Sequence, residues 1–203
     1  MAEPHPLAPW LRLSLTPGLG PASQRQLLAA FGLPHLIYDA GYGAIASVVG
    51  GPAARLLLDH DSRAAVEQAL RWAEEPGNTL VTLGDPAYPA SLLEIPDPPV
   101  CLYVKGDTGL LSRPALAVVG ARSATPQGEA NAEAFAACLS GAGLSIVSGM
   151  ALGIDAAAHR GGLSGPGSTV AVIGTGADRI YPARNGDLAR RIAAAGAIVS
   201  EFP

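Results

Sequence analysis

The second half of the sequence contains four short apolar runs in which hydrophobic residues follow one another instead of alternating with polar ones. The runs cover residues 116–119, 144–147, 169–173 and 197–199. They are rich in valine and isoleucine, and continuous runs of this kind are typical of parallel strands that are buried on both faces. We therefore predict four neighbouring strands of a parallel sheet.

Alanine-rich segments long enough for helices separate these runs, at residues 127–140, 154–163 and 185–195. Strands that alternate with helices predict right-handed crossovers and a doubly wound, mainly parallel α/β sheet. Ligands of such sheets bind at the carboxyl ends of the strands. We therefore expect the loops that follow the first three runs to meet at one edge and to form any binding site.

The first part of the chain, to about residue 75, has a helical pattern. Glycine turns at residues 16–21 and 50–52 each precede a helix-like segment. A further helix-like segment, residues 44–49, precedes the second turn, and residues 63–74 continue as a helix. A glycine turn that opens a helix is typical of a helix-hairpin-helix unit, whose backbone amides can hold a phosphate. The same turns also suit a plain connection between packed helices, and the sequence leaves both readings open.

Two further strand-like runs, at residues 79–83 and 100–106, flank a proline-rich stretch. They either extend the sheet or cap its edge. We accordingly predict a helical domain over residues 1–75 and an α/β domain over residues 76–203.

Composition fits a globular protein, with 203 residues, 49% hydrophobic content and a net charge of −4. No apolar run approaches the roughly 20 residues of a membrane-spanning helix, and the amino terminus lacks a signal-peptide pattern, so we expect a cytoplasmic protein without membrane insertion. The acidity lies before residue 114, because from Leu116 onward there are six basic and six acidic residues. A basic pocket in the α/β domain is compatible with this distribution.

The two cysteines, Cys101 and Cys138, stand far apart among apolar neighbours. This spacing matches neither a zinc site nor a disulfide framework, so we predict two buried thiols. We expect no metal and no cofactor.

The signatures of common enzymes are missing from the predicted loops. There is no Gly-x-Gly-x-x-Gly after the first strand, no P-loop pattern, and Ser148 does not stand in a nucleophile elbow. Asp155 and His159 lie four residues apart on one predicted helix, where they could pair, ligate a metal with a third residue, or form an ordinary helical side-chain pair. They are the candidate pair for an enzyme.

The loops favour anion binding. Arg122 follows the first strand, Arg179 and Arg184 follow the third on either side of Tyr181, and the glycines leave backbone open to close approach. Guanidinium groups suit planar, bidentate contact with phosphate. This chemistry holds a phosphodiester without cleaving it.

Three ordered motifs resemble the DprA/Smf family, the DNA-processing proteins of natural transformation (competence) and DNA recombination. They are Val-Val-Gly-Ala-Arg at residues 118–122, Ser-Gly-Met-Ala-Leu-Gly-Ile-Asp-Ala-Ala-Ala-His at residues 148–159, and Val-Ile-Gly-Thr-Gly at residues 172–176. The resemblance extends over roughly residues 79–203, with Asn185 and the Tyr181-Pro182 pair after the third motif. Ala121 stands where the family often has serine.

The resemblance implies a Rossmann-like domain that binds and protects single-stranded DNA, forms a homodimer and loads the RecA recombinase, without catalysis. The amino-terminal helices are similar to the sterile-alpha-motif-like (SAM-like) or helix-hairpin-helix domain of many members, and whether they bind double-stranded DNA is left open. The DNA-binding positions that it implies are Gly120, Arg122, Ser123, Ser148, Gly149, Gly174, Thr175, Gly176, Arg179, Arg184 and Asn185.

Family members continue beyond the Ser-Glu-Phe-Pro segment at residues 200–203, so we expect a carboxyl-terminally truncated chain whose DNA affinity and dimerisation are reduced. Two other hypotheses remain from the residues themselves. One is a nucleotide- or phosphosugar-processing enzyme that uses Asp155 and His159, because related folds host such chemistry. The other is an interaction scaffold with purely structural glycines.

Overall fold

A computed structural model of the chain describes residues 5–178 and 182–203. The chain divides into two compact units. Unit 1 comprises Met1–Glu75, Thr82–Gly84 and Ala90–Cys101, and unit 2 comprises Pro76–Val81, Asp85–Pro89 and Leu102–Pro203. No helix in the part of the chain that the structure describes is long and apolar enough to cross a membrane.

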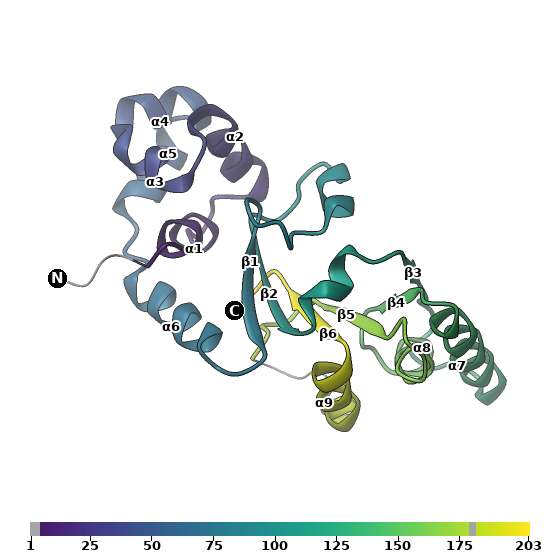
Figure 1. The fold of residues 1–203 in the computed structure, drawn as a ribbon. Coiled ribbons are helices and arrows are strands. Elements are labelled where there is room, and N and C mark those ends of the chain that lie inside the picture. Colours follow the sequence, from purple (N-terminus) through teal and green to yellow (C-terminus); the bar gives the residue numbers. More distant parts are fainter. Residues whose placement is uncertain (1–4, 179–181) are drawn as a thin grey trace. The chain divides into compact units, whose positions relative to one another are not determined.

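Unit 1 is built mainly of short helices (Figure 1). They are α1 (Ala8–Ser14), α2 (Pro21–Phe31), α3 (Pro34–Asp39), α4 (Gly41–Val49), α5 (Gly51–Asp59) and α6 (Arg63–Ala73). The helices predicted before residue 75 are confirmed as α2, α4, α5 and α6, whereas α1 and α3 were not predicted. With seven and six residues, these two are too short for an apolar periodicity to stand out.

The core of unit 1 is a cluster of aliphatic side chains from these helices and from the first glycine turn. Its buried members are Leu13, Leu19, Leu27, Ile37, Ile45, Ala54 and Leu57. Leu19 lies in the middle of the turn, so the turn contributes to the core instead of standing free in solvent.

Unit 2 is built on a six-stranded sheet. The strands are β1 (Asn78–Thr82), β2 (Cys101–Gly106), β3 (Ala115–Ala117), β4 (Ser145–Ser148), β5 (Thr169–Ile173) and β6 (Ala197–Ser200), in the order β1-β2-β6-β5-β4-β3. The pairs among β3, β4, β5 and β6 are parallel, and β2 runs antiparallel to β6. The predicted mainly parallel, Rossmann-like α/β fold is confirmed, and the two upstream runs extend the sheet as β1 and β2.

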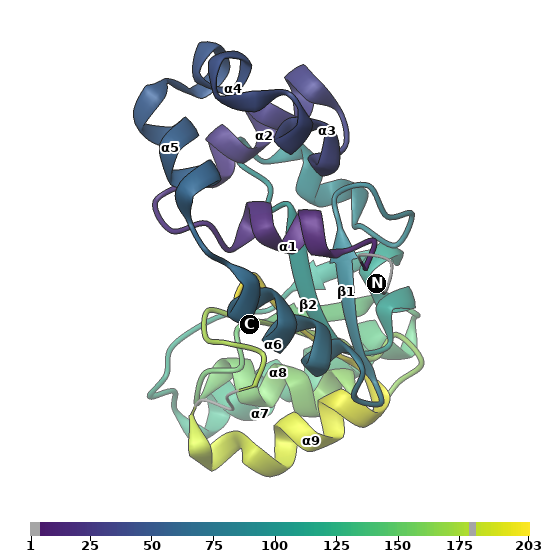
Figure 2. The ribbon, with the colours of Figure 1, turned by 90° about the vertical axis from the view of Figure 1, so that its left-hand side faces the viewer.

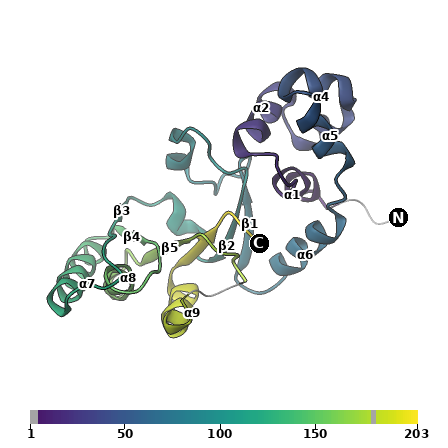
Figure 3. The ribbon, with the colours of Figure 1, turned by 180° about the vertical axis from the view of Figure 1, so that it is seen from behind.

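Three helices connect the parallel strands: α7 (Pro126–Gly141), α8 (Ile154–Gly162) and α9 (Gly186–Ala195). The strand register places Ile146, Ala171 and Ile198 on the same face of the sheet. Ile146 packs with α7 and α8, while Ala171 and Ile198 pack with α8 and α9. These three helices therefore form one layer over one face, which Figures 1, 2 and 3 show from three directions.

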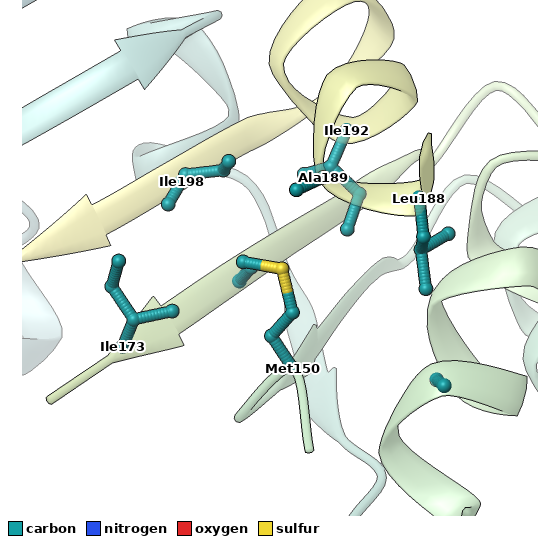
Figure 4. Packing of buried hydrophobic residues seen from close by; sticks show 8 residues of the cluster. Met150, Ile173, Leu188, Ala189, Ile192 and Ile198 are labelled. Carbon is teal, nitrogen blue, oxygen red and sulfur yellow. The ribbon is translucent and has the colours of Figure 1, made fainter. Parts of the chain in front are cut away.

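The packing between this layer and the sheet is close because small residues line the contacts. Figure 4 shows Met150 pointing into the cluster formed by Ile173 and Ile198 of the sheet and by Leu188, Ala189 and Ile192 of α9. In α8, all residues from Asp155 to His159 are buried. This helix lies directly behind the loops that carry the candidate site.

Two short 3-10 segments lie in the connections between the first three strands. A 3-10 turn, η1 (Ala90–Glu94), interrupts the proline-rich stretch, and a second, η2 (Thr108–Ser112), precedes β3.

Cys101 is buried, and burial raises the pKa of its thiol to about 12. The prediction of a second buried thiol was wrong, because Cys138 lies on an exposed part of α7. Its apolar neighbours in sequence point to other sides of the helix.

Candidate nucleic-acid interface

The loops that follow β3, β4 and β5 meet at the carboxyl ends of these strands and surround a pocket of about 280 Å³. Its lining residues are Arg122, Gly149, Ala151, Leu152, Ile173, Gly174, Thr175 and Pro182. All three loops contribute, as expected for parallel strands whose carboxyl ends share one edge. One guanidinium, exposed glycine backbone and a few apolar side chains thus lie together.

Arg122 provides the positive charge of the pocket. Its side chain is exposed. Arg184, on the 3-10 turn η3 (Ala183–Asn185), is exposed as well. Among residues 5–178 and 182–203, neither guanidinium is held in an ion pair, unlike Arg160, which bonds to Glu133 at 2.8 Å. Both groups are therefore available to an anionic ligand.

Two other predicted DNA-binding residues are Arg179 and Ser123. Arg179 and Tyr181 lie outside the described residues. Ser123 is exposed in the loop after β3, one residue from Arg122. Its position suits a contact with the same ligand.

The glycines of the loops differ in their surroundings. Gly174 is exposed, and nothing lies within 4 Å of the place where a Cβ would stand. At Gly120 a Cβ would lie 2.8 Å from Ile154 Cγ1, and at Gly149 it would lie 2.9 Å from a carboxylate oxygen of Asp155. Of these three glycines, Gly174 is the one where a larger residue would meet no close neighbour, so its backbone is open.

Ser148 fastens the loop after β3 to the end of β4. Ser148 is 3% exposed, and its hydroxyl donates a hydrogen bond of 2.7 Å to the carbonyl oxygen of Val118. The donated proton is therefore used inside the protein. Direct contact between Ser148 and DNA stays a prediction, and the geometry assigns this side chain a role in holding two loops together.

Asn185 fastens the loop after β4 to the start of α9. Its buried amide nitrogen donates to the carbonyl oxygens of Met150 at 2.8 Å and Ala151 at 3.3 Å. Met150 has a φ of 59°, a conformation that non-glycine residues seldom adopt. This bond and the burial of the Met150 side chain hold the loop in that shape, so Asn185 supports the pocket from behind.

The loop after β5 is fastened to the last residues of the chain. Ser200 Oγ donates to the Thr175 carbonyl at 2.7 Å, and the Ala177 amide donates to the Phe202 carbonyl at 3.2 Å. A Cβ on Gly176 would collide with the carbonyl oxygen of Pro203. The predicted site residues Thr175 and Gly176 are thus partly occupied by contacts within the chain.

Asp155 and His159, the candidate enzymatic pair, are both buried and are not hydrogen-bonded to each other in the described contacts. The Asp155 carboxylate accepts bonds from the amides of Gly120 at 3.4 Å and Ala151 at 3.3 Å. His159 Nδ1 lies 2.7 Å from Thr169 Oγ1, whose proton goes to the Ile146 carbonyl at 2.6 Å. Thr169 therefore accepts, and His159 carries its proton on Nδ1.

His159 is sealed from solvent. Its side chain is 0% exposed, and Nε2 is buried without a hydrogen-bond partner among the described residues. Burial lowers the pKa of His159 to about 4, while the charge of Asp155 acts in the opposite direction. A neutral ring that no substrate can reach is unsuited to proton transfer. The described residues also contain no group of three or more potential metal ligands.

Sequence reasoning missed two functional supports. Asp155 was considered only together with His159, as a paired side chain, a metal ligand or an ordinary helical residue, and Ser200 was not considered. The signal that would have found Asp155 is its place in the first turn of α8, directly after the loop that it holds. Its partners, however, are backbone amides from separate loops, and these leave no mark in the sequence.

Comparison with known proteins agrees with this architecture. The family model of DNA recombination-mediator protein A matches residues 79–203. Protein Smf from Synechocystis sp. is 35% identical over 202 residues, which cover 96% of this chain and 50% of that protein. DNA processing protein DprA from Streptococcus pneumoniae is 45% identical over 118 residues, which cover 58% of this chain and 42% of that protein. The chain thus spans about half the length of the curated relatives it matches.

Two solved structures are similar to the chain. The X-ray structure of DprA from Streptococcus pneumoniae has a TM-score of 0.78 at 33% identity and covers 96% of this chain and 67% of that one. A structure of DNA processing protein A from Helicobacter pylori has a TM-score of 0.55 at 35% identity and covers 61% of this chain and 56% of that one. The second was described for the single-stranded DNA binding mode of the Helicobacter pylori protein.

Proposed function

The chain belongs to the DNA recombination-mediator protein A family, and on that premise we propose that it binds single-stranded DNA through the loops after β3, β4 and β5. The observation that carries the proposal is the pocket at the carboxyl ends of these strands, where the Arg122 guanidinium, which forms no ion pair with a described residue, stands beside the exposed backbone of Gly149 and Gly174. The structure described for the Helicobacter pylori relative supports the choice of ligand.

The chemistry of the pocket suits a phosphodiester with an attached sugar or base. A guanidinium can hold two phosphate oxygens at once, and Leu152, Ile173 and Pro182 offer apolar surface next to it. Among the described lining residues, Arg122 is the charged side chain, and the others are glycines, apolar residues and Thr175. A guanidinium that holds phosphate fixes position without reading a base. We therefore propose that binding has little sequence preference and involves no covalent step.

Further parts of the proposal rest on the sequence pattern and on the family resemblance. We propose that the whole protein acts in the cytoplasm during natural transformation and recombination, protects the incoming strand as a homodimer, and passes it to RecA. The predicted domains, residues 1–75 and residues 76–203, belong to this proposal. So do the DNA contacts of the eleven residues named from the sequence, Arg179 and Arg184 included.

The test is Arg122→Ala, measured by fluorescence anisotropy with labelled oligothymidine and oligodeoxyadenosine at two salt concentrations. We expect roughly tenfold weaker binding on both sequences, and a salt dependence whose slope falls by about 0.7, as for the loss of one phosphate contact on a single strand.

The matched control is Arg55→Ala, which removes an exposed arginine of α5 beside the second glycine turn of unit 1. It should bind as the unsubstituted chain does. Unchanged binding by Arg122→Ala would refute the proposed site, and an equal loss from Arg55→Ala would move the site to unit 1.

A further inference from the structure

We propose that Asp155 is the positioning residue of the DNA site: its buried carboxylate fixes the distance between the loops after β3 and β4 and thereby presents Arg122 and Gly149 to the strand. This inference rests on the proposed function. It assigns a favourable role in binding an anion to a residue that is itself an anion.

The carboxylate stands between the two loops and reaches both. Asp155 is 7% exposed. Its Oδ1 lies 3.4 Å from the Gly120 amide nitrogen and its Oδ2 lies 3.3 Å from the Ala151 amide nitrogen. Both distances exceed the usual length of about 2.9 Å, so each bond is a weak one, and the two oxygens of one carboxylate are divided between the two loops. A shift of Asp155 would change the position of both loops together.

The absence of a side chain at Gly149 leaves room for the carboxylate. A Cβ at this residue would lie 2.9 Å from Asp155 Oδ2, closer than real Cβ contacts come. Residue 149, in the loop after β4, must therefore leave space for the carboxylate. Gly174, on the neighbouring loop, has open space at the same place.

Other contacts hold the same loops and make the Asp155 bonds part of a closed arrangement. The Ile154 amide donates to the Ala121 carbonyl at 3.2 Å, next to Arg122. Ala151 donates its N–H to Asp155 and accepts at its carbonyl from Asn185. The first turn of α8 also favours a negative side chain through the helix dipole. Among the side-chain hydrogen bonds described for residues 5–178 and 182–203, those of Asp155 reach the loops after both β3 and β4.

The sign of the charge makes the proposal testable. Coulomb's law alone predicts that removal of a negative charge close to a phosphate site strengthens DNA binding. Positioning predicts the opposite, because the loops separate when the carboxylate is lost. Asp155→Asn keeps the size of the side chain, removes the charge, and brings an NH₂ group up against one of the two amide donors.

We expect Asp155→Asn to bind labelled oligothymidine about tenfold more weakly than the unsubstituted chain, a loss of the size seen when a hydrogen bond to a charged group is removed. Asp187→Asn is the control for charge, because Asp187 is an exposed acid in the first turn of α9 that pairs only with Arg190 in the described contacts. It should bind with equal or slightly higher affinity.

Gly149→Ala tests the same position without a change of charge, because the new methyl group displaces the carboxylate. We expect a loss similar to that of Asp155→Asn. Amide hydrogen exchange provides the specific readout: exchange at Gly120 and Ala151 should accelerate in both variants, while amides of the β5 and β6 strands keep their protection. A general loss of structure would accelerate all of them.

Equal or tighter DNA binding by a folded Asp155→Asn would overturn the positioning role. If that variant does not fold, unchanged binding by Gly149→Ala overturns it instead. Failure of the proposed function looks different, because then Arg122→Ala would bind like the unsubstituted chain, or neither would bind, whereas exchange at Gly120 and Ala151 would still respond to Asp155→Asn.

Discussion

Two regions of this protein place glycines in the turns and loops that lead into helices, and they use them differently. In the helical unit, Gly18 and Gly50 have φ angles of 78° and 85° and reverse the chain between packed helices. Pro21 takes the first position of α2 and has no N–H to offer a ligand. In the sheet unit, the glycines lie beside buried polar side chains, Ser148, Asp155 and Asn185, that hold the backbone from behind.

This difference shows what turns a glycine loop into a candidate binding site. A glycine permits a turn, but it does not fix the turn in space. In the sheet unit, bonds from buried side chains fix three loops around one guanidinium. In the helical unit, Leu19 of the first turn packs into the core, and the buried Gln24 amide donates to the Leu19 carbonyl oxygen at 2.8 Å. That bond joins a turn to the helix that directly follows it, whereas the bonds in the sheet unit join separate loops. The three tests below compare the units, from the largest expected effect to the smallest.

The largest effect should come from acid, acting on the sheet unit through His159. The folded chain holds this pKa at about 4, below the ordinary 6.5, so the unfolded chain takes up the proton first as the pH falls. The free energy of unfolding should therefore decrease between pH 6.5 and pH 4, by about 3 kcal/mol in total. Urea titrations at pH 7.5 and pH 4 measure this decrease.

The control is His159→Asn, whose amide can still donate to Thr169 but does not titrate. The free energy of unfolding of this variant should decrease by about 3 kcal/mol less over the same pH range. If Asn is not tolerated, an NMR titration of the unsubstituted chain decides, because the His159 ring should stay neutral until about pH 4. A ring that titrates near pH 6.5 would contradict the buried, neutral state. In the helical unit, none of the described histidines, His5, His35 and His60, is buried.

A smaller effect is expected from Gly161→Ala in α8. A Cβ there would lie 2.8 Å from the Ala136 Cβ and 2.9 Å from the Ala137 amide nitrogen of α7, and would collide with the Glu133 carbonyl. The two helices must move apart, so we expect a loss of about 2 kcal/mol in the free energy of unfolding, typical of overpacking. Hydrogen exchange in β4 and β5 would report it, and unchanged protection there would refute the close contact of α7 and α8.

The smallest effect should be Gly43→Ala in α4, and it should have the opposite sign. Gly43 lies within the helix, its φ is not positive, and nothing stands within 4 Å of a Cβ there. Alanine should stabilise unit 1 by about 0.5–1 kcal/mol. Both tryptophans, Trp10 and Trp72, belong to unit 1, so the urea midpoint of their fluorescence measures this gain. A destabilised variant would show that unit 1 constrains its glycines as the sheet unit does.

Much of the fold could be predicted from local pattern. The apolar runs became β3 to β6 within about two residues of their predicted bounds, because a strand buried on both faces has no polar position to obscure it. Helices α1 and α3 were not predicted, because they are too short to show an apolar periodicity. Cys138 was predicted to be buried because its sequence neighbours are apolar, but neighbours in sequence point to different sides of a helix.

The candidate site was predictable in place but not in the roles of its residues. Strand ends followed by glycine and Arg122 indicated the edge of the sheet, where the pocket lies. The sequence did not separate Arg122, which is exposed, from Ser148 and Asn185, which are buried and bonded to backbone carbonyls. All three are polar residues near strand ends, and burial decides which of them a ligand can reach.

The sequence by itself determined the order of strands and helices, the Rossmann-like class and the edge at which three loops converge, since these follow from short-range periodicity and from the handedness of crossovers. Only the tertiary structure decided that Asp155 bonds to amides at Gly120 and Ala151, that His159 is buried and neutral beside Thr169 of β5, and that Gly149 makes room for a carboxylate. These contacts join residues from separate loops. Their energies depend on distance and burial in the folded chain, which no local pattern records.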